Sequence, residues 1–328
     1  MRFVICLFLV LPMLAQSRAE ALRKMELAMG QMPKLDRKRS LAVRTVATED
    51  GGSYTRTKIT YEPEAGRVVY AWLLVPKGAG RRPAALCLHQ TTRIGKDEPI
   101  GVGPKVNLYY AKELAERGWV VLAPDYPSFG DDKTDFEKDV YGRGYQSGTL
   151  YGIVNHTRAV DLLAAHPRVD KRDIVVIGHS LGGHNALFVA AFDERIRAVV
   201  TSCGFTAFAK YYGGNLKGWT STRYMPRIAS VYDNSPAKVP FDFTDVLTAI
   251  APRGVFINAP LRDANFDASG VDDVVSAVRP RFPKGRLIVE HPSAEHDFPV
   301  PERLKAYSFL ASFTRFLQLA NDPHGENP

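Results

Sequence analysis

A serine set between glycines is the part of the chain whose residue types most clearly predict chemistry. Residues 178–182 read Gly-His-Ser-Leu-Gly, after a β-branched apolar run at 173–177 and before an apolar helical pattern at 183–191. A strand, a sharp turn at a serine and a helix form an elbow that exposes a nucleophilic hydroxyl, and only small residues fit where the backbones pass closely. Ser180 is therefore the candidate nucleophile, and a glycine-rich turn with an incidental serine is the alternative.

A serine hydroxyl becomes an effective nucleophile only when a neighbouring base takes its proton. His296 is the preferred base, because it lies in the loop between the last predicted strand, 286–290, and the last predicted helix, 301–320. In a parallel sheet this loop lies at the same edge as the serine. His291 is the alternative, although its position directly after the strand indicates a more buried place.

A carboxylate that orients the base completes such a site. The preceding predicted strand, 254–259, is followed by Asp263 and Asp267. Asp263 is preferred because it lies closer to the strand end, whereas Asp267 is also suited to cap the next helix. The order serine, aspartate, histidine along the chain differs from the orders in the two common groups of serine proteases.

The negative charge that develops on a substrate carbonyl needs two preorganised N–H donors. The backbone of Leu181, directly after the serine, is one candidate. The second is expected from the loop after the strand at 84–88, with Gln90 preferred and Thr91 as the alternative. Further residues expected to contact substrate are His89, Thr91, Tyr126, Trp219 and Tyr224. For Tyr126, a role in a turn that holds a hydrogen-bonded aspartate is the alternative.

These residues need a scaffold that brings distant loops to one edge. Strand patterns lie at 53–61, 68–75, 84–88, 119–124, 173–177, 196–201, 254–259 and 286–290. Helical patterns lie at 20–40, 108–117, 148–166, 183–191, 271–277 and 301–320. Because strands and helices alternate after the first two strands, we expect an α/β fold. Its sheet is mostly parallel and eight-stranded, with helices on both faces and an antiparallel pair at one edge.

One connection is far longer than α/β connections usually are. This insertion, at about 204–250, is rich in aromatic residues, Trp219 and Tyr224 among them. A lid that faces substrate would need such side chains. Aromatic residues that pack onto the core are the alternative interpretation.

The N-terminus has the pattern of a cleavable secretion signal. A short cationic start precedes an apolar stretch at 3–15, and a small-x-small site ends at Ala19. We expect cleavage after Ala19 and a secreted or periplasmic protein without a stable membrane span, with an uncleaved anchor as the alternative. The expected organisation is a signal peptide at 1–19, a leader at 20–52, a catalytic domain at 53–320 and a tail at 321–328.

Composition argues against several classes of partner. The 328 residues carry a net charge of +8, but the basic residues are scattered and form no basic helix with interleaved aromatic residues. A nucleic-acid partner is therefore not expected. Cys87 and Cys203 are expected to be buried free thiols, and neither has the spacing of a metal ligand. We expect neither a metal nor another cofactor.

Together these motifs resemble the α/β-hydrolase superfamily. Residues 178–185, Gly-His-Ser-Leu-Gly-Gly-His-Asn, and 88–91, Leu-His-Gln-Thr, are further similar to dienelactone hydrolase-like and prolyl oligopeptidase-like catalytic domains, a group that includes secreted acetyl xylan esterases. The resemblance covers roughly residues 55–320. Dienelactone hydrolases proper use a cysteine where this chain has Ser180, and the chain has no room for the propeller of prolyl oligopeptidases.

The resemblance implies a secreted serine hydrolase of carboxylic esters that works through an acyl-serine intermediate. It also implies a small-molecule or carbohydrate ester as substrate, with acetyl or other short acyl groups on carbohydrate preferred, and no cofactor. A small serine peptidase or amidase is one alternative. A hydrolase fold without activity, used for binding, is the other.

Overall fold

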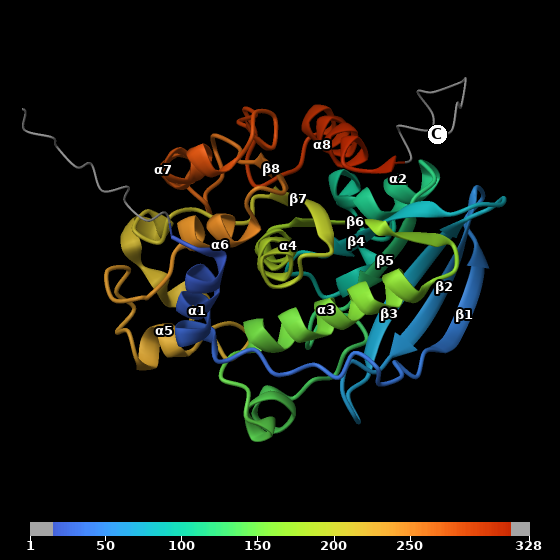
Figure 1. Ribbon diagram of the computed structural model, residues 1–328, viewed down its shortest axis with the longest axis horizontal. Coiled ribbons are helices and arrows are strands. Elements are labelled where there is room, and N and C mark those ends of the chain that lie inside the picture. The colour runs from blue at the N-terminus through green and yellow to red at the C-terminus, as the bar shows by residue number, and fades with distance from the viewer. Residues whose placement is uncertain (1–15, 316–328) are drawn as a thin grey trace, which may run out of the picture.

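Nine strands form one sheet within residues 16–315, the part of the chain that the computed structural model describes (Figure 1). Their order across the sheet is β1-β2-β3-β5-β4-β6-β7-β8-β9. The strands are β1 Arg44–Asp50, β2 Tyr54–Tyr61, β3 Val69–Pro76, β4 Arg82–Leu88, β5 Val120–Pro124, β6 Val169–His179, β7 Ile196–Ser202, β8 Gly254–Asn258 and β9 Leu287–Glu290.

The predicted mostly parallel sheet is confirmed, but the predicted number of strands was one too few. β1, β2, β3 and β5 pair antiparallel in that order, and β5, β4, β6, β7, β8 and β9 pair parallel. The ninth strand, β1, lies in the predicted leader and pairs along β2. All seven of its residues are exposed. An edge strand without a buried face has no alternating apolar pattern, so the sequence carried no signal for it.

Helices cover both faces of the sheet, as expected (Figure 1). Alternate residues of the central strands contribute to two separate cores. Ala84 and Leu86 of β4 belong to the core that includes α1, α3, α4, α6 and α7, whereas Ala85 and Cys87 belong to the core beneath α2 and α8. The helices are α1 Arg18–Met29, α2 Tyr110–Glu116, α3 Gly148–Ala165, α4 Leu181–Phe192, α5 Arg227–Ser230, α6 Phe243–Ile250, α7 Ala268–Val278 and α8 Val300–Ser312. Among the described helices, none is both long and apolar enough to cross a membrane.

The insertion at 204–250 consists of short helical turns, α5 and α6. Most of its large aromatic residues are buried in the core of the α4 face. They are Phe205, Phe208, Trp219, Phe241 and Phe243. Tyr211 and Tyr224 are only half-buried. Most of its rings therefore pack onto the core, as the alternative interpretation held, and a few remain at the surface, as a lid that faces substrate would need.

The first described residues are fastened to this insertion and to the core. Ser17 caps α1 by accepting a hydrogen bond from the Glu20 N–H at 3.2 Å. The Gln16 side chain donates to Asp245 of α6 at 2.6 Å, and Arg18 donates to the Ala191 carbonyl at 2.8 Å. The predicted cleavage point after Ala19 thus lies inside the first turn of α1. The apolar part of the predicted signal, 3–15, lies outside the described residues.

We predict that a chain starting at Glu20 is less stable than one starting at Gln16. The shorter chain lacks the Ser17 cap and the contacts of Gln16 and Arg18, and loss of a helix N-cap alone costs about 1 kcal/mol. A loss of this size lowers Tm by about 2–4 °C in a large domain. Calorimetric melting of the two purified chains measures the difference. Equal Tm values would mean that the first turn of α1 contributes nothing to the fold.

Candidate active site

The candidate nucleophile lies at the turn between β6 and α4. β6 ends at His179, α4 begins at Leu181, and Ser180 between them has φ 53° and ψ −118°. This is a left-handed conformation that residues other than glycine rarely adopt. The Ser180 N–H donates to the Ser202 carbonyl of the adjacent strand β7 at 2.8 Å, which holds the strained turn against the sheet.

The glycines around Ser180 stand where no side chain fits. A Cβ on Gly178 would fall on the carbonyl oxygen of Gly182, and a Cβ on Gly182 would fall on the carbonyl oxygen of Leu88 at the end of β4. A Cβ on Gly183 would lie 2.9 Å from the Cα of Gly204. The elbow can therefore pack between its neighbouring strands only if these positions are glycine.

The candidate base and acid are joined directly. His296 Nδ1 lies 2.9 Å and 3.0 Å from the two carboxylate oxygens of Asp263. The Asp263 side chain also accepts the backbone N–H of Asn265 at 2.8 Å and of Phe266 at 3.3 Å. Burial raises the pKa of Asp263, but the hydrogen bond and charge of His296, with the Asn265 N–H, bring that pKa below its usual value. Asp263 is therefore a buried, ionised acceptor for the His296 ring.

The two alternatives considered for these positions have other partners. Asp267 caps α7, because its carboxylate accepts the Ser269 N–H at 2.8 Å and the Ser269 hydroxyl at 2.7 Å. His291 lies between the Ala259 carbonyl, 2.7 Å from Nδ1, and Asp272, 3.0 Å from Nε2. Neither side chain forms a hydrogen bond with His296.

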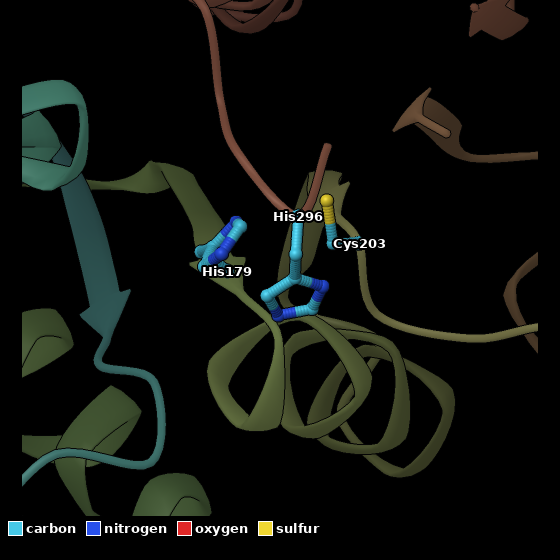
Figure 2. Close-up of side chains that lie close together, drawn as sticks. All are labelled: His179, Cys203 and His296. Carbon is cyan, nitrogen blue, oxygen red and sulfur yellow. The ribbon is translucent and has the colours of Figure 1, made fainter. Parts of the chain in front are cut away.

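Three side chains, one from the end of β6 and two from the segments that follow β7 and β9, meet at this edge of the sheet (Figure 2). Ring nitrogens of His179 and His296 and the sulfur of Cys203 lie within 4.8 Å of one another. In Figure 2 the ring of His296 points from its own loop toward the start of α4, the helix that follows Ser180. Among the described residues there is no hydrogen bond between the Ser180 hydroxyl and His296. Such bonds are often long without substrate and tighten in the reacting complex.

The donor chemistry of this cluster fits structural support better than metal binding. Burial raises the pKa of the Cys203 thiol well above its ordinary value, and nearby Asp263 raises it further, whereas a metal needs the thiolate. The thiol donates to the Asp297 carbonyl at 3.4 Å. Burial lowers the pKa of His179 well below its ordinary value, and its Nδ1 lies 2.9 Å from the Ser202 hydroxyl. The Nδ1 of His296 is already engaged by Asp263.

A second hydrogen-bond network fixes the loop that carries His296. The Asn258 side chain at the end of β8 donates to the Ser202 hydroxyl at 2.8 Å and to the Asp297 carbonyl at 2.9 Å. The sequence interpretation did not include Asn258, and it considered Cys203 only as a buried thiol. Cys203 directly follows β7, the neighbour of the elbow strand, and Asn258 ends β8, the next strand across the sheet; these positions at the carboxyl ends of strands are the signal that could have identified them.

A pocket of about 200 Å³ opens beside the candidate nucleophile. Its lining includes Thr91, Ser180, Leu181, His184, Tyr211, Trp219, Tyr224, Asn265 and Phe266. Thr91, Trp219 and Tyr224 were expected to contact substrate. A larger hollow, of about 490 Å³, is lined by Arg172, Arg197, Arg286 and Arg315, and none of the candidate catalytic residues borders it.

His89 and Tyr126, also expected to contact substrate, lie behind the pocket wall. The Nε2 of His89 accepts the Tyr126 N–H at 2.9 Å, and the Tyr126 hydroxyl donates to the Arg223 carbonyl at 2.8 Å. Burial lowers the pKa of His89 to about 4, so its ring is neutral and accepts at Nε2. Both residues hold the loops after β4 and β5 in place.

The loop after β4, which carries the oxyanion candidates Gln90 and Thr91, is held in place by two side-chain contacts. The Gln90 side chain donates to Glu98 at 2.9 Å, so it is turned into the protein. Lys96 is fully buried and pairs with Asp125 at 3.0 Å, which links the loops after β4 and β5. Leu181 is the first residue of α4, and the N–H groups of a first helical turn have no partner within the helix.

Comparison with known proteins shows which sequences this chain resembles. YtaP of Bacillus subtilis (strain 168) is 27% identical over 78% of this chain and 85% of its own length. Acetyl esterase Axe7A of Xylanibacter ruminicola is 28% identical over 41% of this chain and 32% of its own length.

Solved structures share the fold at low identity. A glucuronoyl esterase from Solibacter usitatus superposes with a TM-score of 0.72 at 16% identity, covering 90% of this chain and 91% of that one. Acetyl xylan esterase 1 from Thermoanaerobacterium sp. JW/SL YS485 gives 0.62 at 16% identity, covering 90% and 93%. The model of the Alpha/beta hydrolase family matches residues 104–324, more than half of the sequence. The chain belongs to the alpha/beta hydrolase family.

Proposed function

We propose that this protein is a serine hydrolase of carboxylic esters. Ser180 is the nucleophile, His296 the general base and acid, and Asp263 the carboxylate that orients His296. The observation that carries the proposal is the pair of contacts between His296 Nδ1 and Asp263, 2.9 Å and 3.0 Å long, beside a serine at a strained strand-to-helix turn. Nucleophile, base and orienting acid are the three roles that acyl transfer by a serine requires.

The proposed reaction has two halves. His296 Nε2 takes the hydroxyl proton as Ser180 Oγ forms a bond to the ester carbonyl carbon. The C–O bond to the alcohol then breaks, and His296 returns the proton to the leaving alcohol. A water molecule next attacks the acyl-serine, with His296 again taking and returning a proton, and the carboxylic acid leaves.

Charge on the carbonyl oxygen needs donors that are already in place. We assign this role to the backbone N–H of Leu181, which also lies at the positive end of the α4 dipole, and to that of Gln90. Asp263 keeps its charge in a buried place, so it stabilises the imidazolium that forms on His296 in each half of the reaction.

The proposed substrates are short-chain, acetyl-type esters of carbohydrates. A pocket of about 200 Å³ with aromatic walls supports a small, ring-containing substrate over a long acyl chain. The names of several similar proteins, an acetyl esterase and acetyl xylan esterases among them, support the same class. Export through the N-terminal signal would place the enzyme outside the cytoplasm with such substrates.

We predict that the purified enzyme hydrolyses nitrophenyl acetate and butyrate faster than the decanoate, by about tenfold or more in kcat/KM, because the pocket is small. Ser180→Ala is expected to lower kcat by about 10⁴-fold or more. Release of nitrophenol measures both. A wild-type enzyme that cleaves none of these esters, or a Ser180→Ala variant that cleaves them as well as wild type, would refute the esterase proposal.

We predict different outcomes for the two neighbouring aspartates. Asp263→Asn leaves His296 without an anionic partner and is expected to lower kcat by about 10³–10⁴-fold. Asp267→Asn is the matched control, because asparagine also caps helices and Asp267 does not contact His296. Its kcat and Tm are expected to stay near those of wild type. Equal loss of activity in both variants would contradict the assignment of Asp263.

A further inference from the structure

The pocket wall beside Ser180 contains buried polar groups that have no hydrogen-bond partner. His184 lies on α4, one turn after Ser180, and is 6% exposed, while Trp219 of the insertion is 3% exposed. Both side chains line the pocket. Among the described residues the Trp219 Nε1 has no hydrogen-bond partner, and the His184 ring has at most one, the Gly204 backbone. Buried polar groups are nearly always paired, so unpaired groups in a pocket wall point to a ligand.

The two side chains together present a defined set of donors and acceptors. Burial lowers the pKa of His184 to about 3, against a smaller opposite effect of the Gly204 backbone, so the ring is neutral at ordinary pH. A neutral imidazole has one N–H donor and one bare nitrogen acceptor, and an indole has one donor. The two ring centroids are 4.9 Å apart, close enough for one small ligand to meet both.

This set matches hydroxyl groups better than other ligand groups. A hydroxyl both donates and accepts, so adjacent hydroxyls can pair with the indole N–H and with the free nitrogen of the imidazole. An alkyl chain would leave both of them unpaired. A carboxylate would meet a bare nitrogen and no cation. Tyr211, Tyr224 and Phe266 supply apolar walls of the kind that covers the faces of a ring.

Access to these polar groups requires a small movement of the pocket wall, because their nitrogens are cut off from solvent. The ring of Tyr224 lies 6.2 Å from that of His184, and the ring of Tyr211 lies 5.6 Å from that of Trp219. Both tyrosines are half-buried, whereas His184 and Trp219 are fixed in the core. The tyrosines are therefore the parts of the wall that a ligand can displace.

We propose that His184 and Trp219 form a hydroxyl-recognition subsite for the sugar ring of the ester substrate. The subsite lies next to Ser180, and entry of the ring parts Tyr211 and Tyr224 and gives the polar groups of the wall their missing partners. This inference rests on the proposed esterase function and adds that the alcohol part of the substrate, a polyhydroxylated ring, determines specificity.

The test compares two acetate esters that differ only in hydroxyl groups. One is methyl 3-O-acetyl-β-xylopyranoside, and the other is 2-methoxytetrahydropyran-4-yl acetate, which has the same ring, methoxy group and ester position without the two hydroxyls. Wild-type enzyme is expected to prefer the xyloside by about tenfold or more in kcat/KM, because a site built for hydroxyls rejects the analogue without them. Trp219→Phe and His184→Phe are expected to reduce this preference to about threefold or less, mainly by raising KM for the xyloside.

The matched control is Trp119→Phe, which changes a buried tryptophan in the core beneath α2 and α8, away from the pocket. It is expected to keep the wild-type preference. Trp219→Phe keeps an aromatic ring in place, so it tests the N–H if His184→Phe fails to fold. Equal losses on both substrates in Trp219→Phe, or no preference in wild type, would overturn the subsite while leaving the esterase proposal intact. No hydrolysis of any ester by wild type would overturn both.

Discussion

The close contact between the β6–α4 elbow and the end of β4 is the constraint on which the site depends. Any side chain at Gly178 or Gly182 would collide with backbone, so the turn is tight enough to hold Ser180 at φ 53°. The same contact places the first turn of α4 against the loop that follows Leu88. The candidate nucleophile and both oxyanion candidates are thereby fixed by backbone packing, before any substrate binds.

The order of strands brings the remaining residues to this elbow. β6, β7, β8 and β9 are consecutive neighbours in a parallel sheet, so their carboxyl ends lie side by side. Ser180, Cys203, Asp263 and His296 each follow one of these ends. Hydrogen bonds between the loops, such as those of Asn258 with Ser202 and Asp297, then hold His296 in one orientation. The site is assembled by adjacency in the sheet, although its residues are far apart in the sequence.

The insertion forms a pocket over this edge of the sheet, where the candidate catalytic residues lie. Its buried rings stack on α4 and on one another, as Phe205 does on Phe243 with ring centroids 4.8 Å apart. Lys24 of α1 and Gln16 just before α1 hold it from the outside through Asp245 of α6. Only a few of its aromatic side chains remain free to meet a ligand. An insertion anchored in this way acts as a shaped wall rather than a loose cover, and the proposed subsite requires only Tyr211 and Tyr224 at its rim to move.

The sequence by itself determined the fold class and the candidate serine, because the glycine pattern and the alternation of strands and helices are local signals. It also made His296 the candidate base, from its place between the last strand and helix. It could not reveal β1, whose residues are all exposed, nor distinguish Asp263 from Asp267, since both follow the same strand.

Tertiary structure decided these points and others. The path of the loop after β8 turns Asp263 toward His296 and leaves Asp267 to cap α7. The packing of the loops after β4 and β5 puts His89 behind the pocket wall. The packing of the insertion on α4 sets His184 against Trp219. Contacts of this kind join residues from different elements, and they depend on loop paths and side-chain packing that no local pattern in the sequence encodes.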